Sequence, residues 1–140
     1  MSLRKTVRIS FFKTVGLLYK KQSTMSNIKF PKFIITKAKN GEYVFNLWAV
    51  NGRIILTSSE TYTQKQNCNK GIESVKNHAD DDKYYERKIA KNETQYYFNL
   101  KARNGQIIGK SEMYESTASR DNGIEAIKRD APKAETEDLS

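Results

Sequence analysis

The sequence has almost none of the residues that build disulfides and metal sites, and it lacks a long hydrophobic run. Its 140 residues include one cysteine, Cys68, and one histidine, His78. A single cysteine cannot form a disulfide within the chain, so the chain would gain no disulfide in an oxidising compartment. We therefore expect a cytoplasmic protein. No apolar run approaches the roughly 18 residues of a membrane-spanning helix, so we expect no membrane partner.

Acidic residues are absent from the first 24 positions, where six Lys and Arg residues supply most of the net charge of +9. This leader fits a secretory signal, although Lys13 divides its apolar stretch, and it fits an organelle transit peptide because it is basic, hydroxylated and free of acids. A third interpretation starts the natural protein at Met25 and treats the leader as an extension. Under all three we expect residues 1–32 to be a poorly ordered basic leader.

The rest of the chain is a tandem duplication. The segment FNLWAVNGRIIL at 45–56 recurs 53 positions later as FNLKARNGQIIG at 98–109. After a one-residue slip the match resumes, with SETY at 59–62 answered by SEMY at 111–114, and GIESVK at 71–76 answered by GIEAIK at 123–128. We therefore predict two repeats, 33–82 and 83–139, that form one domain, because about 55 residues alone bury too little surface.

Each repeat begins with strands joined by tight turns. In both copies apolar residues alternate on either side of an Asn-Gly pair, which favours a two-residue type I′ turn because both central residues need positive φ. At Asn51-Gly52 such a turn places Ala49 opposite Ile54 and Leu47 opposite Leu56. We predict three strands per copy.

A helix follows the third strand of each repeat. Apolar residues recur there at helical spacing: Ile72, Val75 and Ala79, then Ile124, Ile127 and Ala131. Ser116 is a good N-cap for the second helix, and Gln64 is a poorer one for the first. The glycines inside the helices, Gly71 and Gly123, cost up to about 1 kcal/mol each, which predicts a close approach of helix to sheet. Segments typical of strands follow the helices, at 83–90 and 134–139.

Four long segments resemble the YegP-like family of small bacterial proteins: NGRIILTSSETY, GIESVKNHA, YYFNLKARNGQIIGKSEMY and GIEAIKRDAPKAETEDL. The resemblance implies an α+β fold in which tandem β-β-β-α-β units form one antiparallel sheet. It also implies exchanged C-terminal strands and two helices packed on one face. The family has no established biochemical activity, so the resemblance implies no catalytic site. The chain departs from the family pattern in its leader, at Asn67-Cys68 and at Trp48.

The residues that carry chemistry elsewhere have plainer interpretations here. His78 is expected on the surface near a helix C-terminus, and Cys68 in the core as a small hydrophobe. The acidic run 80–82 is expected to be a solvated linker, since calcium loops space their ligands. Glu60 and Glu112 recur in both copies and are expected to position the corner between strand and helix. We predict no enzyme, no cofactor and no metal.

The remaining candidate is the sheet face that the helices leave uncovered. The predicted register turns an aromatic and basic set outward: Trp48, Arg53, Ile55, Tyr97, Lys101, Arg103 and Lys110. An exposed Trp48–Ile55 pair is a modest apolar patch, which favours an interaction module for a protein partner or a second copy of the chain. The alternative is single-stranded nucleic acid such as RNA, which binds aromatic and basic side chains on open sheets.

Overall fold

The structure, a computed structural model, describes residues 28–140, which form seven strands and two α-helices. Most of the predicted leader, residues 1–27, lies outside the described residues. The strands are β2 (Lys32–Lys37), β3 (Tyr43–Trp48), β4 (Ile54–Ser58), β5 (Tyr85–Ile89), β6 (Tyr96–Lys101), β7 (Ile107–Lys110) and β8 (Glu135–Asp138). The α-helices are α3 (Lys65–His78) and α4 (Thr117–Asp130), and the short 3-10 helices η1 (Asp82–Tyr84) and η2 (Ala131–Lys133) come after them.

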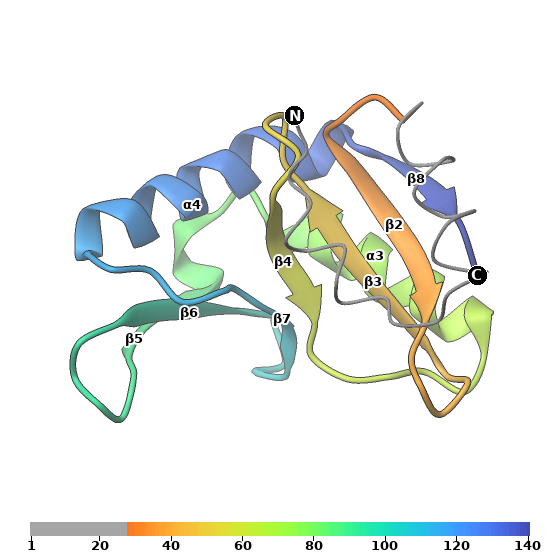
Figure 1. The fold of residues 1–140 in the computed structure, drawn as a ribbon, viewed down its shortest axis with the longest axis horizontal. Coiled ribbons are helices and arrows are strands. Elements are labelled where there is room, and N and C mark those ends of the chain that lie inside the picture. Colours follow the sequence, from red (N-terminus) through yellow and green to blue (C-terminus); the bar gives the residue numbers. More distant parts are fainter. Residues whose placement is uncertain (1–27) are drawn as a thin grey trace.

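The strands lie in one sheet in the order β5-β6-β7-β4-β3-β2-β8, so the two repeats meet at the central β4–β7 pair (Figure 1). Neighbouring strands are antiparallel except β8, which runs parallel to β2. The sheet is therefore mixed, and the prediction of a fully antiparallel sheet is wrong for this pair. The cause is the connection, because β8 arrives through a helix from the other repeat and not through a hairpin.

The repeats exchange their last strands, as the family resemblance implied. β8 ends the second repeat and lies beside β2, the first strand of the first repeat. β5 follows α3 along the chain as β8 follows α4, and it pairs with β6 of the second repeat. Each repeat therefore completes the sheet of the other.

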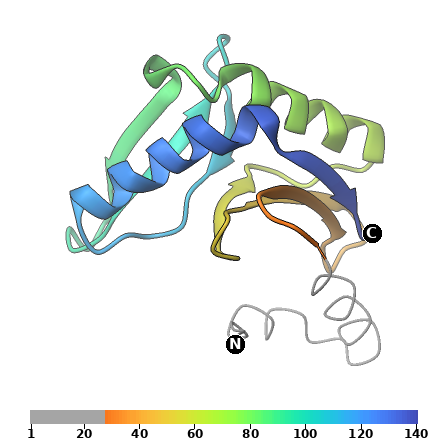
Figure 2. The ribbon, with the colours of Figure 1, turned by 90° about the horizontal axis from the view of Figure 1, so that it is seen from above.

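Both helices cover the same face of the sheet (Figure 2), and the core between them draws on both repeats. Alternate strand residues point into this core, as their period-two pattern predicts. Phe33 and Phe45 pack edge to face there, with ring centroids 6.1 Å apart. The largest side chains of the cluster are Phe33, Phe45, Phe98, Ile35, Leu47, Leu56, Leu100, Ile72, Ile124, Ile127 and Val75.

The Asn-Gly turns differ from the prediction. Only the glycine of each pair adopts positive φ, +80° at Gly52 and +88° at Gly105. The Gly52 N–H donates to the Ala49 carbonyl at 2.8 Å, so residues 50–51 form the centre of the turn and the glycine follows as a bulge. The turn is thus one residue longer than a type I′ turn.

This extra residue changes the strand register. Leu47 lies opposite Leu56, as predicted, but the pairing then shifts and Ile54 lies opposite Trp48. The predicted Ala49–Ile54 pair is therefore wrong. Beyond the shift, the predicted assignment of residues to faces of the sheet no longer holds, and this affects the candidate site.

The helix glycines accommodate tyrosines from the corner between strand and helix. A Cβ at Gly71 would lie 2.6 Å from Tyr62 Oη and 3.0 Å from the Phe45 ring, and a Cβ at Gly123 would collide with Tyr114 Oη. The close approach predicted for these glycines is therefore present, and the tyrosines make the closest contacts.

A serine in each repeat fixes the same corner. Ser58 Oγ donates to the Glu60 carbonyl at 2.9 Å, and Ser111 Oγ donates to the Glu112 carbonyl at 2.8 Å. Ser58, and not Ser59, is therefore the counterpart of Ser111. Both serines bond to the backbone carbonyl of the glutamate and not to its carboxylate, so the positioning role of the glutamate side chains stays a prediction.

Candidate binding groove

Two of the predicted binding residues are buried. Trp48 is 5% exposed and stacks on Phe30, with ring centroids 5.5 Å apart. Ile55 is 7% exposed and belongs to the main core under the helices. The predicted exposed Trp48–Ile55 patch is wrong, because the bulge directs Ile55 into the core and the segment before β2 covers Trp48. Around Trp48 and Ile34 pack Ile28, Phe30, Ile54 and Leu139.

The other predicted residues separate into two groups. Tyr97, Lys101 and Lys110 lie on β6 and β7, on the sheet face opposite the helices, which we call the helix-free face. The Lys101 ammonium there donates to Glu86 Oε2 at 3.1 Å. Arg53 and Arg103 lie in the two turns, off the sheet face. The predicted face therefore exists only in the second repeat.

A groove that the sequence does not predict lies between the β3–β4 turn and α4. It has a volume of about 570 Å³. The turn, the corner before α4 and one side of α4 form its walls. Its lining residues are Ala49, Val50, Asn51, Arg53, Ile55, Glu112, Met113, Tyr114, Glu115, Ser119, Asn122, Gly123, Ala126 and Arg129.

Exposed apolar side chains gather at this groove. Val50 is 64% exposed and Met113 is 49% exposed, and both line it. Among the described residues the one other large hydrophobic side chain with comparable exposure is Ile89, on β5. Exposed apolar side chains that meet at a concave surface are typical of binding sites.

The equivalent turn of the second repeat is fastened to a helix. The Arg103 N–H donates to His78 Nε2 at 3.1 Å, and His78 Nδ1 therefore carries the hydrogen that it donates to the Ser74 carbonyl at 2.7 Å. His78 is the last residue of α3, so this pair of bonds joins the β6–β7 turn to the helix. His78 lies near the helix C-terminus, as predicted, but it acts as a latch between two elements.

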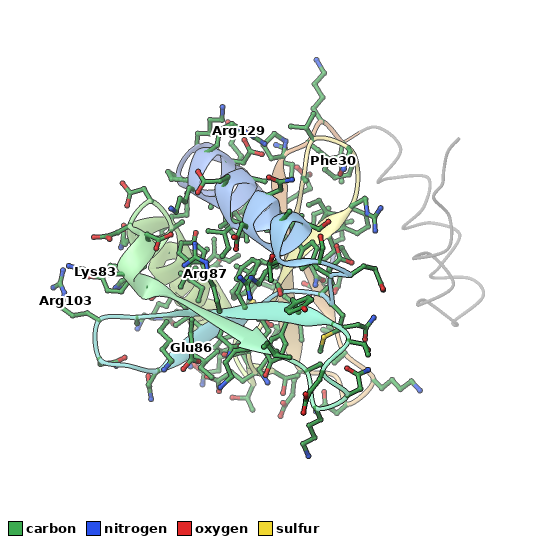
Figure 3. The ribbon with its side chains drawn as sticks, turned by 90° about the vertical axis from the view of Figure 1, so that its left-hand side faces the viewer. Phe30, Lys83, Glu86, Arg87, Arg103 and Arg129 are labelled. Atoms are coloured by element: carbon green, nitrogen blue, oxygen red, sulfur yellow. The ribbon has the colours of Figure 1, made fainter. Side chains whose placement is uncertain are left out.

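The β3–β4 turn has no such latch. The last residue of α4 is Asp130, the counterpart of His78, and it is 1% exposed. Arg129 binds both carboxylate oxygens of Asp130, Nε at 2.9 Å and Nη2 at 3.0 Å. Among the described residues no hydrogen bond joins the turn to α4. Figure 3 shows Arg103 at the end of the latched hairpin and Arg129 on α4, far from it.

Tyr114 adds an unpaired polar group to the groove. It lines the groove, and its buried hydroxyl has no hydrogen-bond partner among the described residues. Burial raises the pKa of Tyr114 to about 12, with the Glu112 carboxylate adding to this effect and Arg53 opposing it. At neutral pH the phenol is therefore a hydrogen-bond donor without an acceptor.

The other residues considered for chemistry have structural roles. Cys68 is fully buried, and burial raises its thiol pKa to about 11, so little thiolate forms at neutral pH. The acidic run 80–82 is not a free linker, because Asp82 binds Arg87 at 2.9 Å and Lys128 at 2.8 Å. Within residues 28–140 no three acidic, histidine or cysteine side chains are placed to hold a metal. No helix in this range is long and apolar enough to cross a bilayer.

Comparison with known proteins identifies the repeats. Residues 38–86 and 92–138 each match the family described as Domain of unknown function (DUF1508). The chain belongs to the DUF1508 family. The family resemblance drawn from the sequence is therefore confirmed.

The chain is similar to small bacterial proteins. The chain is 50% identical to a UPF0339 protein of Bordetella pertussis over 106 residues, which is 76% of this chain and 94% of the relative. It is 46% identical to the UPF0339 protein YegP of Escherichia coli over 96 residues, 69% of this chain and 86% of YegP.

Solved structures share this DUF1508 fold. The solution NMR structure of a UPF0339 protein from Shewanella oneidensis superimposes with a TM-score of 0.72 at 44% identity, covering 77% of this chain and 90% of that one. The solution NMR structure of Escherichia coli YegP also gives 0.72, at 41% identity, with 79% and 94% covered.

Proposed function

We propose that this DUF1508 protein is a non-enzymatic binding module that holds a segment of a partner protein in the groove between the β3–β4 turn and α4. The observation that carries the proposal is the meeting of Val50 and Met113, two strongly exposed apolar side chains, at one groove. Burying such side chains against a partner is a main source of binding free energy.

The surroundings of these residues suit a peptide segment. The groove lining includes the small apolar side chains of Ala49 and Ala126, which suit an apolar side chain of the partner. Polar residues line the groove as well, and protein interfaces combine apolar and polar contacts. The unlatched turn leaves room for the partner to enter.

The test is selection of peptides from a random display library on the immobilised full chain. Peptides that bind the groove should lose about tenfold or more in affinity for a Val50→Ser, Met113→Ser double variant, since each lost apolar contact weakens binding. Ile89→Ser is the matched control, because Ile89 is also exposed but lies on β5. Equal affinity for wild type and the double variant, or loss with Ile89→Ser alone, would contradict the proposal.

A second candidate function is single-stranded nucleic-acid binding on the helix-free face. Tyr97, Lys101 and Lys110 favour it, because they share one face of β6 and β7. Trp48 cannot contribute a stacking surface while Phe30 covers it, and Lys101 is already bound to Glu86. The structure therefore leaves fewer side chains available to contact nucleic acid than the sequence predicted.

Fluorescence anisotropy with a labelled oligouridylate of about 12 nucleotides tests this candidate. Binding should weaken steeply with salt and disappear in a Lys101→Glu, Lys110→Glu double variant, while Lys39→Glu, in the β2–β3 turn, should change it little. Affinity that is independent of salt, or equal in both variants, would reject nucleic acid as the ligand.

We also propose a cytoplasmic location, because a chain with one cysteine gains no internal disulfide from an oxidising compartment. The proposal predicts that the tagged full chain co-fractionates with cytoplasmic marker proteins. Recovery in the periplasmic fraction of a bacterial host would contradict it.

A further inference from the structure

The two repeats leave their outer sheet edges in different states. β2 pairs with β3 through Phe33 opposite Leu47, and β5 pairs with β6 through Tyr85 opposite Leu100. Leu47 and Leu100 are equivalent in the duplication, so β5 occupies in the second repeat the place that β2 occupies in the first. Beside β2 lies β8, whereas β5 is the last strand at its end of the described sheet.

We propose that the outer edge of β5 accepts an extended acidic segment of a partner protein, as an added parallel strand in the place that β8 holds beside β2. Adding a strand to a sheet edge is a common mode of peptide recognition, in which main-chain hydrogen bonds supply much of the affinity. The site is separate from the groove proposed above.

The backbone of β5 is set up for such pairing. Tyr96 exchanges both of its backbone hydrogen bonds with Tyr114, at 2.8 and 2.7 Å, so these groups point away from β5. In an antiparallel pair the residue opposite then directs its own N–H and carbonyl outward, and that residue is Ile89. Phe98 likewise bonds to Ser111, so its partner Arg87 also points its backbone groups outward.

The β2–β8 pair shows how an added strand binds at this position. The Leu139 N–H donates to the Ile35 carbonyl at 2.9 Å. Ile35 lies opposite Phe45 as Arg87 lies opposite Phe98. The outward carbonyl of Arg87 is thus the counterpart of an acceptor that already binds a strand in this molecule.

The side chains indicate an acidic occupant. β8 contains Glu135, Glu137 and Asp138, and the Lys32 ammonium of β2 lies 3.0 Å from Glu135 and 3.9 Å from Glu137. On β5 the Lys88 ammonium makes no ion pair within the described residues. An acidic side chain of an added strand would therefore find a cation there.

β5 lacks two of the features that usually prevent edge pairing, proline and a β-bulge. Its pairing with β6 has no register shift, and it ends with Ile89, which is 58% exposed. It does carry charge: Arg87, opposite the buried Phe98, lies on the helix side, where Asp82 and Asp121 bind it. Figure 3 shows Glu86 and Arg87 on opposite sides of β5.

The test uses a capped synthetic peptide with the sequence of this chain's own strand, AETEDLS (residues 134–140), titrated into the ¹⁵N-labelled full chain. We expect saturable shifts of the Arg87 and Ile89 amide signals. The same peptide with its acids replaced by glutamine and asparagine should bind about threefold more weakly or worse, because it cannot pair with Lys88.

Variants of β5 separate backbone pairing from side-chain contact. Ile89→Pro removes an outward N–H without removing a bond to β6 and should weaken the peptide about tenfold, whereas Ile89→Thr keeps the N–H and should bind like wild type. A peptide N-methylated at its leucine gives the same test without altering the protein. In the proposed pairing the leucine N–H donates to the Arg87 carbonyl, and the methyl group removes this donor.

Three results would overturn the proposal. These are absence of shifts at millimolar peptide, shifts confined to β2 and β8, and undiminished binding of the N-methylated peptide. A Val50→Ser, Met113→Ser chain should bind AETEDLS like wild type, so failure at the β5 edge and failure at the groove are distinguishable.

Discussion

At the residue scale, two tyrosine hydroxyls with buried oxygens differ in their hydrogen bonding. The Tyr85 hydroxyl donates to the Ala79 carbonyl at 2.6 Å, while the Tyr114 hydroxyl is buried with no partner among the described residues. A satisfied hydroxyl stabilises a core and an orphaned one costs free energy. The unpaired Tyr114 hydroxyl therefore lowers the free energy of unfolding.

Removing the two hydroxyls should have opposite effects on the free energy of unfolding. Tyr85→Phe loses a buried hydrogen bond and should destabilise by about 1–2 kcal/mol, because the Ala79 carbonyl is left unpaired. Tyr114→Phe should be neutral or stabilising by up to about 1 kcal/mol. Urea unfolding of both variants measures the difference, and equal losses would show that the Tyr114 hydroxyl has an acceptor in solution.

The carboxyl group of Asp82 should make the free energy of unfolding depend on pH in the acidic range. Hydrogen bonds from Arg87 and then Lys128 hold the pKa of its carboxyl well below its usual value. A depressed folded-state pKa gives stability that is fully present above the unfolded-state value, near 4, and is lost as pH falls below it. Because the side chain is 54% exposed, solvent screening keeps this contribution below about 1 kcal/mol.

Asp82→Asn should therefore lower the free energy of unfolding at pH 7 and flatten its decline between about pH 5 and 2. Asp80→Asn is the control, since Asp80 is exposed and forms no ion pair with the described residues. Urea unfolding across this pH range measures both. Identical pH profiles for wild type and Asp82→Asn would show that the Asp82 network is absent in solution.

At the element scale, the helices followed from the sequence and the turns did not. Helical periodicity and the caps are local signals, and Ser116 caps α4 as predicted, accepting from the Ser119 N–H at 3.1 Å. Asn-Gly suits more than one turn, because glycine at positive φ also serves the bulge after a longer turn. The sequence could not decide between them, and the one-residue difference moved Ile55 into the core.

The caps give a matched test on two equivalent helices. Ser116→Ala should lower the free energy of unfolding by about 1 kcal/mol, because a helix N–H loses its acceptor. Gln64→Ala should change it little, since Gln64 begins α3 without a side-chain hydrogen bond. Thermal unfolding compares the two variants. A larger loss from Gln64→Ala than from Ser116→Ala would contradict the capping geometry.

At the scale of the whole molecule, the duplication predicted the shared sheet, but the site depends on where the repeats differ. The groove opens where Asp130 stands in place of His78, a difference visible in the sequence whose effect appears only when the turn and the helix are seen together. Phe30 covers Trp48 from outside the repeats, which no comparison of the copies could reveal. Three of the seven predicted face residues nevertheless share a surface.

Deleting residues 134–140 tests how far the exchanged strand supports the whole. The truncation removes the partner of β2, the Lys65–Asp138 ion pair of 2.7 Å and the packing of Leu139 near Trp48. We expect a loss of roughly 2–4 kcal/mol, seen as a lower midpoint of thermal unfolding and partly reversed by added AETEDLS peptide. A truncated chain as stable as the full one would contradict this role of β8.

β5 is shared by the two repeats, and this limits how further repeats could be added to such a chain. Because β5 closes one repeat and opens the next, each added repeat contributes three new strands and borrows a fourth. In a chain with a third copy after Ser140, β8 would serve as the first strand of that copy and would no longer pair with β2. Adding a repeat at one end of the sheet would therefore leave β2 without a neighbour at the other end.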